Sequence, residues 1–109
     1  MLKELTTQDI INRLIGNEVA RVNDIKPLYA STHEGWALMK EEIEEANDEL
    51  DIVNALHNKF WNQIKYDHNN NEIIQDVIDI KLRSIKAIEE LIQVCCVCDR
   101  FEQSSKEWD

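Results

Sequence analysis

Glycine and proline are scarce in this chain of 109 residues, which contains two glycines and one proline. An all-β sandwich or a dinucleotide-binding α/β fold needs many tight turns and glycine-rich loops, so the composition excludes both. No apolar run reaches the roughly eighteen residues of a membrane-spanning helix. The N-terminus also lacks the basic and then apolar pattern of a signal peptide. We therefore expect one cytoplasmic domain over residues 1–109.

Basic residues are outnumbered by acidic ones, with 12 Lys and Arg against 22 Asp and Glu, and the net charge is −10. Such a chain is repelled by nucleic acid backbones and by anionic membranes, so neither is an expected partner. A negatively charged substrate is still compatible with this charge if divalent cations bridge the two.

Cysteine occurs three times, at Cys95, Cys96 and Cys98. An odd number of cysteines within four residues excludes a disulfide framework. Because they lie in the apolar helical run Leu91–Phe101, we expect thiols packed in the core of a protein from a reducing compartment. A metal or redox site with the Cys95–Cys98 spacing is the alternative. Beyond this run, the tail formed by residues 104–109 is expected to fray.

Helical periodicity accounts for nearly all of the chain. The first expected helix covers Gln8 to Val22, with Thr6 or Thr7 as its N-cap, and it ends ahead of Pro27.

The second expected helix begins after a cap at Ser31 or Thr32 and extends to about Tyr66. Residues 67–71, Asp-His-Asn-Asn-Asn, predict a turn because Asp and Asn compete with the helix for backbone hydrogen bonds. The third expected helix covers residues 72–103.

The two long expected helices each carry an apolar stripe with steps of three and four residues. In the second it comprises Trp36, Met39, Ile43, Ala46, Leu50, Val53 and Phe60. In the third it comprises Ile74, Ile78, Ile85, Ile88, Ile92 and Cys95. Each helix would be about 45 Å long, which is more than the first helix can cover. We therefore predict an all-α helical bundle, built on a long antiparallel helical hairpin plus an N-terminal helix and completed by homo-oligomerisation into a dimer or tetramer.

Acidic side chains crowd the second expected helix. Helical spacing places Glu42, Glu45 and Glu49 on one face beside the apolar stripe. A neighbouring row is formed by Glu41, Glu44 and Asp48. Like charges at this spacing destabilise a helix, and Mg²⁺, which prefers carboxylate oxygens, is the natural counter-charge. The alternative is an acidic face in water, partly neutralised by Lys40 and Lys86.

A turn centred near residue 69 predicts which positions of the two long helices face each other. The facing pairs are Glu45 with Gln93, Asp48 with Glu90, Asp76 with Asn62, and Asp79 with Lys59. This register brings four oxygen-bearing side chains within about one turn of each other, and they are Glu42, Glu45, Glu90 and Gln93.

Residues 31–45, Ser-Thr-His-Glu-Gly-Trp-Ala-Leu-Met-Lys-Glu-Glu-Ile-Glu-Glu, resemble the all-α nucleotide pyrophosphohydrolases of the MazG-like superfamily, in particular its small phage-type branch. That superfamily carries Glu-Glu-x-x-Glu on one helix and Glu-x-x-Asp on the next. The first motif matches residues 41–45, and the second corresponds to Glu90-Leu91-Ile92-Gln93. The phage-type branch also tends to carry His-Glu-Gly before the first motif, as at residues 33–35, and small residues after the second, where Cys95 and Cys96 stand here. The resemblance covers about residues 30–101.

This resemblance implies hydrolysis of a nucleoside triphosphate, in particular a deoxynucleotide, to the monophosphate and pyrophosphate. It implies that Glu42, Glu45 and Glu90 bind Mg²⁺, with Mn²⁺ as a substitute. Gln93 stands where the family has aspartate, and its amide oxygen can bind a cation but adds no charge. The change would weaken metal binding, favour one ion over several, or abolish catalysis. If the protein is phage-encoded, its compartment is the host cytoplasm.

Further roles follow from the same mechanism. A carboxylate beside the ligands, Glu41 or Glu49, would accept a proton from the attacking water. The cations for the phosphates would be Lys40, Lys86 or Arg100. His33 would lie near the site, and the base would stack on Trp36, Phe60 or Trp61. Two other functions stay open: a catalytically silent helical oligomer acting as a binding or structural protein, and a regulatory coiled-coil partner.

Overall fold

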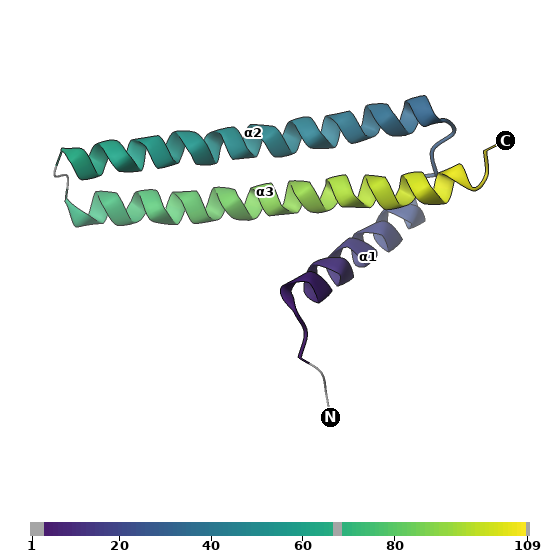
Figure 1. The fold of residues 1–109 in the computed structure, drawn as a ribbon, viewed down its shortest axis with the longest axis horizontal. Coiled ribbons are helices and arrows are strands. Elements are labelled where there is room, and N and C mark those ends of the chain that lie inside the picture. Colours follow the sequence, from purple (N-terminus) through teal and green to yellow (C-terminus); the bar gives the residue numbers. More distant parts are fainter. Residues whose placement is uncertain (1–3, 67–68, 109) are drawn as a thin grey trace. The chain divides into compact units, whose positions relative to one another are not determined.

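The protein is all-helical. The computed structural model describes residues 4–66 and 69–108, which form α1 (Thr7–Ile25), α2 (Thr32–Lys65) and α3 (Asn70–Ser105), as Figure 1 shows. No strand occurs within these residues, so the predicted fold class is confirmed at this level. Within these residues, no helix combines the length and the apolar character that crossing a membrane requires.

The start of α1 is set by a capping box. The Thr6 hydroxyl accepts a hydrogen bond from the Asp9 backbone N–H at 3.0 Å, and the Asp9 carboxylate accepts one from the Thr6 N–H at 2.9 Å. The two bonds satisfy backbone donors that have no partner within the helix. The helix ends at Ile25, one turn later than predicted, and Lys26 is its C-cap.

Short polar side chains also begin the other two helices. The Ser31 hydroxyl accepts from the Glu34 N–H at 3.2 Å, and the Asn69 side chain accepts from the Glu72 N–H at 3.0 Å. Both are N-cap contacts of the kind that local sequence encodes. Asp67 and His68 of the predicted turn lie outside the described residues, and α3 begins at Asn70, two residues before the prediction.

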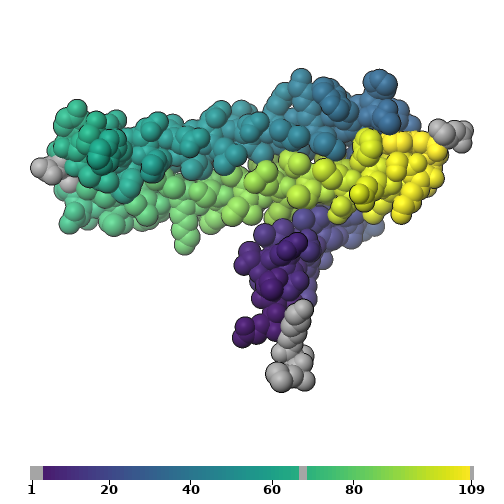
Figure 2. All heavy atoms as spheres, viewed as in Figure 1, coloured from purple at the N-terminus to yellow at the C-terminus, as the bar shows by residue number. Residues whose placement is uncertain are grey.

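The chain divides into two compact units, and the division cuts α2 and α3. The first unit comprises the residues up to Ile43 and those from Leu91 onward, so it contains α1, the start of α2 and the end of α3. Its buried apolar side chains are Val19, Tyr29, Cys96 and Val97. The second unit, Glu44–Glu90, consists of the remaining parts of α2 and α3, and their atoms pack directly against each other in Figure 2.

In the first unit residues 104–108 are held in place, so the prediction of a frayed tail is wrong for them, and Asp109 lies outside the described residues. Ser104 is 1% exposed, and its hydroxyl accepts a hydrogen bond from the Tyr29 N–H at 2.9 Å. The Trp108 indole N–H donates to the Tyr29 carbonyl at 3.0 Å. The Trp108 ring lies edge-on to the Phe101 ring, with 5.2 Å between the two ring centroids. The loop before α2 therefore supplies backbone partners that orient the tail, which local sequence does not reveal.

Gly35 allows Phe101 to approach α2. A Cβ at Gly35 would lie 2.4 Å from Cδ2 of Phe101 and 3.2 Å from Cδ2 of Tyr29, whereas a Cβ at Gly16 on α1 would have no neighbour within 4 Å. We expect Gly35→Ala to lower the free energy of unfolding by about 1–3 kcal/mol through overpacking. Gly16→Ala, the matched control, should raise it by about 0.5–1 kcal/mol because glycine weakens a helix interior. Urea unfolding of both variants tests this pair, and equal effects at the two sites would contradict it.

A buried carboxylate lies in the second unit. Asp76 is 1% exposed, its Oδ1 lies 3.2 Å from Lys59 Nζ, and its Oδ2 accepts from the Gln63 amide at 2.7 Å. Lys59 was predicted to face Asp79, and Asp76 to face Asn62. Asp76 instead meets Lys59 and Gln63, so the predicted register is displaced by one to three residues at this point. The physical reason is where the helices stop: α2 ends at Lys65 and α3 begins at Asn70, which moves the midpoint of the connection toward the N-terminus.

Only part of the predicted core is buried within one chain. Cys96 is buried, but Cys95 and Cys98 are exposed free thiols, so the expectation of core thiols is wrong for those two. On α2 the predicted stripe splits. Met39, Ala46, Val53 and Phe60 are buried or half-buried, whereas Trp36, Ile43 and Leu50 are exposed. On α3, Ile74, Ile78, Ile85 and Ile88 are exposed as well.

Candidate metal and phosphate site

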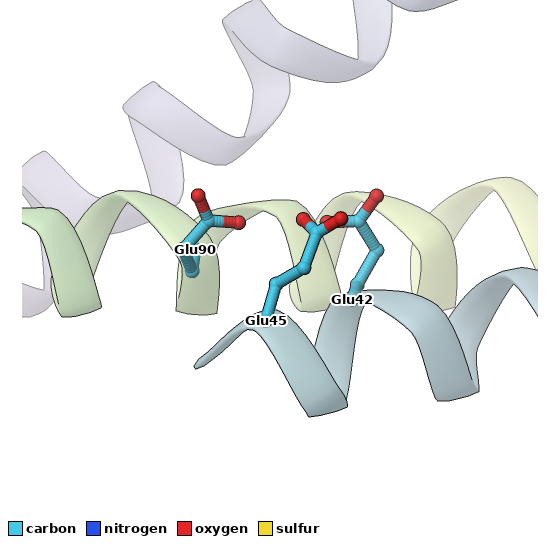
Figure 3. A group of neighbouring side chains, drawn as sticks. All are labelled: Glu42, Glu45 and Glu90. Atoms are coloured by element: carbon cyan, nitrogen blue, oxygen red, sulfur yellow. The ribbon is translucent and has the colours of Figure 1, made fainter. Parts of the chain in front are cut away.

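Three carboxylates come together at the two predicted motifs. Glu42 and Glu45 stand one turn apart on α2, and within the second unit Glu45 meets Glu90 of α3 (Figure 3). One carboxylate oxygen from each lies within 4.8 Å of the other two. Glu42 and Glu90 are half-buried and Glu45 is exposed. This is the spacing at which one cation can touch all three side chains.

Burial and neighbouring negative charges of the second unit act on the Glu90 carboxyl. Burial raises the pKa of the Glu90 carboxyl above its ordinary value of 4.5, and the Glu45 carboxylate that shares a hydrogen bond with it raises the pKa further. The charges of Glu49 and Glu89 act in the same direction. A bound divalent cation would remove this penalty, so the donor set fits a hard cation such as Mg²⁺.

The raised pKa of Glu90 predicts a pH dependence of stability. The folded protein holds the Glu90 proton to higher pH than the unfolded chain does, so stability falls as pH rises from about 4.5 through the raised pKa. Without metal, the melting temperature of Glu90→Gln relative to wild type should therefore increase across this window and then level off. Thermal melts from pH 4 to 8, with Asp48→Asn as control, test this. A difference that is constant with pH would contradict it.

The fourth predicted ligand, Gln93, lies at the edge of a cavity in the first unit. Its side chain helps Arg21, the main cause, to lower the pKa of the Glu18 carboxyl. An amide oxygen can bind a cation but adds no charge. Gln93 and Glu42 line the same cavity of about 250 Å³.

The two predicted proton acceptors are placed differently. Glu49 lies in the second unit, half-buried, with Arg83 Nη1 3.5 Å from its carboxylate, and its charge acts on Glu90. Glu41 is exposed on α2, and neither residue belongs to the group of three carboxylates.

The predicted substrate residues fall into three environments. His33 and Trp36 line an apolar hollow of about 430 Å³ with Met39 and Phe101. Lys40 Nζ lies 5.6 Å from the centroid of the Trp36 ring, so it is held close to that hollow as a cation–π contact. Lys86 is exposed on α3 in the second unit.

Arg100 has a structural role that the sequence did not indicate. It is 3% exposed, and its guanidinium donates to Asn23 Oδ1 at 2.8 Å, to the Lys26 carbonyl at 3.1 Å and to the Pro27 carbonyl at 2.8 Å. These bonds satisfy carbonyls after the end of α1. Breaking these bonds would leave buried polar groups without partners, which strongly destabilises a protein. Arg100 therefore primarily holds the connection between α1 and α2.

Sequence reasoning missed Arg21 and Lys26, which line the cavity together with Glu42, Gln93 and Arg100. The segment before Pro27 carries no motif, and helical spacing alone does not reveal which face of α1 meets α3.

Comparison with family models, curated proteins and solved structures found no match for the chain.

Proposed function

We propose that this protein is a Mg²⁺-dependent nucleoside triphosphate pyrophosphohydrolase, a hydrolase that converts a (deoxy)nucleoside triphosphate and water to the monophosphate and pyrophosphate. The observation that carries the proposal is the meeting of Glu42, Glu45 and Glu90 within 4.8 Å. These are the three positions at which the resemblance to the MazG-like superfamily expects metal-binding carboxylates.

In this proposal Glu42, Glu45 and Glu90 hold the cation, and the Gln93 amide oxygen is the fourth donor. Mg²⁺ supplies charge neutralisation of the phosphate oxygens and acidifies water in the site. Glu49, whose charge already acts on Glu90, accepts the proton of the attacking water. The apolar hollow of His33 and Trp36 supplies a surface on which a base can stack.

We further propose a helical hairpin of α2 and α3 that is completed by a second copy of the chain. Contact pairs run in opposite directions along the two helices, as Glu49 with Arg83 and Lys59 with Asp76 in the second unit. Exposed apolar side chains follow both helices, among them Leu50 of α2 and Ile88 of α3. A second copy of the chain would remove these side chains from water.

The test is pyrophosphate release from a panel of canonical and modified nucleoside triphosphates with Mg²⁺ or Mn²⁺. Metal-dependent release that EDTA stops is the expected result. The rival function, a silent helical oligomer, is favoured by one observation, which is Gln93 in place of aspartate. No release from any nucleotide by a folded oligomer would decide for that rival.

A further inference from the structure

The cavity of the first unit is lined by both basic and acidic side chains. Arg21, Lys26 and Arg100 line it, and Glu42 and Gln93 line it too. Glu42 therefore belongs both to this cavity and to the carboxylate group described above. A ligand that touches a cation held by Glu42 can at the same time reach basic side chains from α1 and from the residue that follows it.

The three basic side chains are not equivalent. Arg100 is buried and donates to one side-chain oxygen and two backbone carbonyls, so it is committed to the fold. Arg21 is different, since its side chain is 61% exposed and its partner is Glu18, one turn away on the same helix. Glu18 is half-buried, with 19% of its side chain exposed, but the pair lies at the surface, where ion pairs are weak. Lys26 is exposed as well.

The acidic wall of this cavity calls for a basic side chain that can meet phosphate. Glu42 lines the cavity and repels a polyphosphate, so a cation of the same cavity is needed to bind it. A guanidinium matches two phosphate oxygens with its planar fork of N–H donors. The cavity, of about 250 Å³, is smaller than the roughly 300–1,000 Å³ of sites that enclose whole small ligands, so it suits the phosphate chain alone.

We propose that Arg21, assisted by Lys26, binds the polyphosphate chain of the substrate in this cavity. The proposal deepens the proposed function and rests on it. Arg21 leaves Glu18 for the phosphates. In this arrangement α1 forms one wall of the substrate site as well as packing against α3.

The experiment uses the full chain and two readouts. Binding of inorganic tripolyphosphate with Mg²⁺ is measured by calorimetry, and nucleotide turnover is measured by pyrophosphate release. The variants are Arg21→Ala, Arg21→Lys and Lys26→Ala. Arg13→Ala is the matched control, because Arg13 is an exposed arginine of α1 that does not line the cavity. Melting temperatures show whether each variant is folded.

We expect Arg21→Ala to weaken tripolyphosphate binding about tenfold or more and to raise KM for the nucleotide, as loss of a charge-assisted bidentate contact predicts. Arg21→Lys should recover part of the binding, Lys26→Ala should lose less, and Arg13→Ala should stay within about twofold of wild type. The melting temperatures should match because Arg21 is exposed.

The outcomes separate the two proposals. Binding that depends on Arg21 in a protein that hydrolyses no nucleotide supports this inference and overturns the proposed function. An active enzyme whose KM and tripolyphosphate affinity are unchanged in Arg21→Ala overturns this inference and leaves the proposed function. A wild-type protein that neither binds tripolyphosphate nor releases pyrophosphate overturns both.

Discussion

Replacing Glu45 and Glu90 together by glutamine should lower kcat for Mg²⁺-dependent pyrophosphate release by at least about 100-fold. The two carboxylates lie close together in the second unit and supply two of the three charges that would hold the cation. A metal ion contributes several kcal/mol of transition-state stabilisation, and every 1.36 kcal/mol is about tenfold in rate. Initial rates at saturating nucleotide, over a range of Mg²⁺ concentrations, measure the loss.

The same variant should be at least as stable as wild type when metal is absent. Glutamine removes the like charges that raise the pKa of Glu90 and that oppose folding at neutral pH. Lost activity with a retained or raised melting temperature therefore identifies a functional defect. Asp48→Asn, which removes one exposed carboxylate of the same helix, is the control and should keep its activity. Full turnover by the double variant would remove these carboxylates from the mechanism.

Introducing a charge into the exposed apolar stripes should convert a homo-oligomer into monomers of 12.8 kDa. Ile88 on α3 is 52% exposed and Leu50 on α2 is 42% exposed, and each belongs to a stripe with steps of three and four residues. An unpaired carboxylate buried between two chains costs several kcal/mol. Ile88→Asp and Leu50→Asp should therefore weaken self-association by about 1000-fold or more.

Sedimentation equilibrium over a range of protein concentrations measures this effect. Ala55→Asp is the matched control, because it places the same carboxylate at an exposed position of α2 outside the stripe, and it should stay oligomeric. A wild-type protein that sediments as a monomer at micromolar concentration would contradict the homo-oligomer. A monomer would instead favour the alternative of a regulatory coiled-coil partner, in which the stripe binds a helix of another protein.

The exposed stripes also explain why a single chain buries few of its large apolar side chains. Among the described residues, nineteen large apolar side chains are exposed, while six hydrophobic residues are buried. In α2 the positions at every seventh residue from Trp36 to Ile64 point away from the described partners, with His57 as the polar member of the series. Heptad spacing of this kind is typical of a seam between helices of different chains.

Local sequence determined the helices because their signals are local. Scarce glycine and proline, the capping threonine at Thr6 and the serine at Ser31 each act within one turn of the chain. Helical spacing likewise placed Glu42 and Glu45 on one face of α2, since residues three apart always share a face. These features were predicted correctly, with helix ends displaced by at most three residues.

Only the tertiary structure decided what lies between segments distant in the chain. The side chain that meets Glu45 is Glu90, whereas the predicted register paired Glu45 with Gln93, because the register depends on where α2 and α3 stop. Arg100 looked like a phosphate ligand by spacing, and the carbonyls of Lys26 and Pro27 instead engage its guanidinium. The face that α1 turns toward α3, and with it Arg21, follows from packing of side chains that carry no motif. Periodicity sets which residues share a face, and packing alone sets what that face meets.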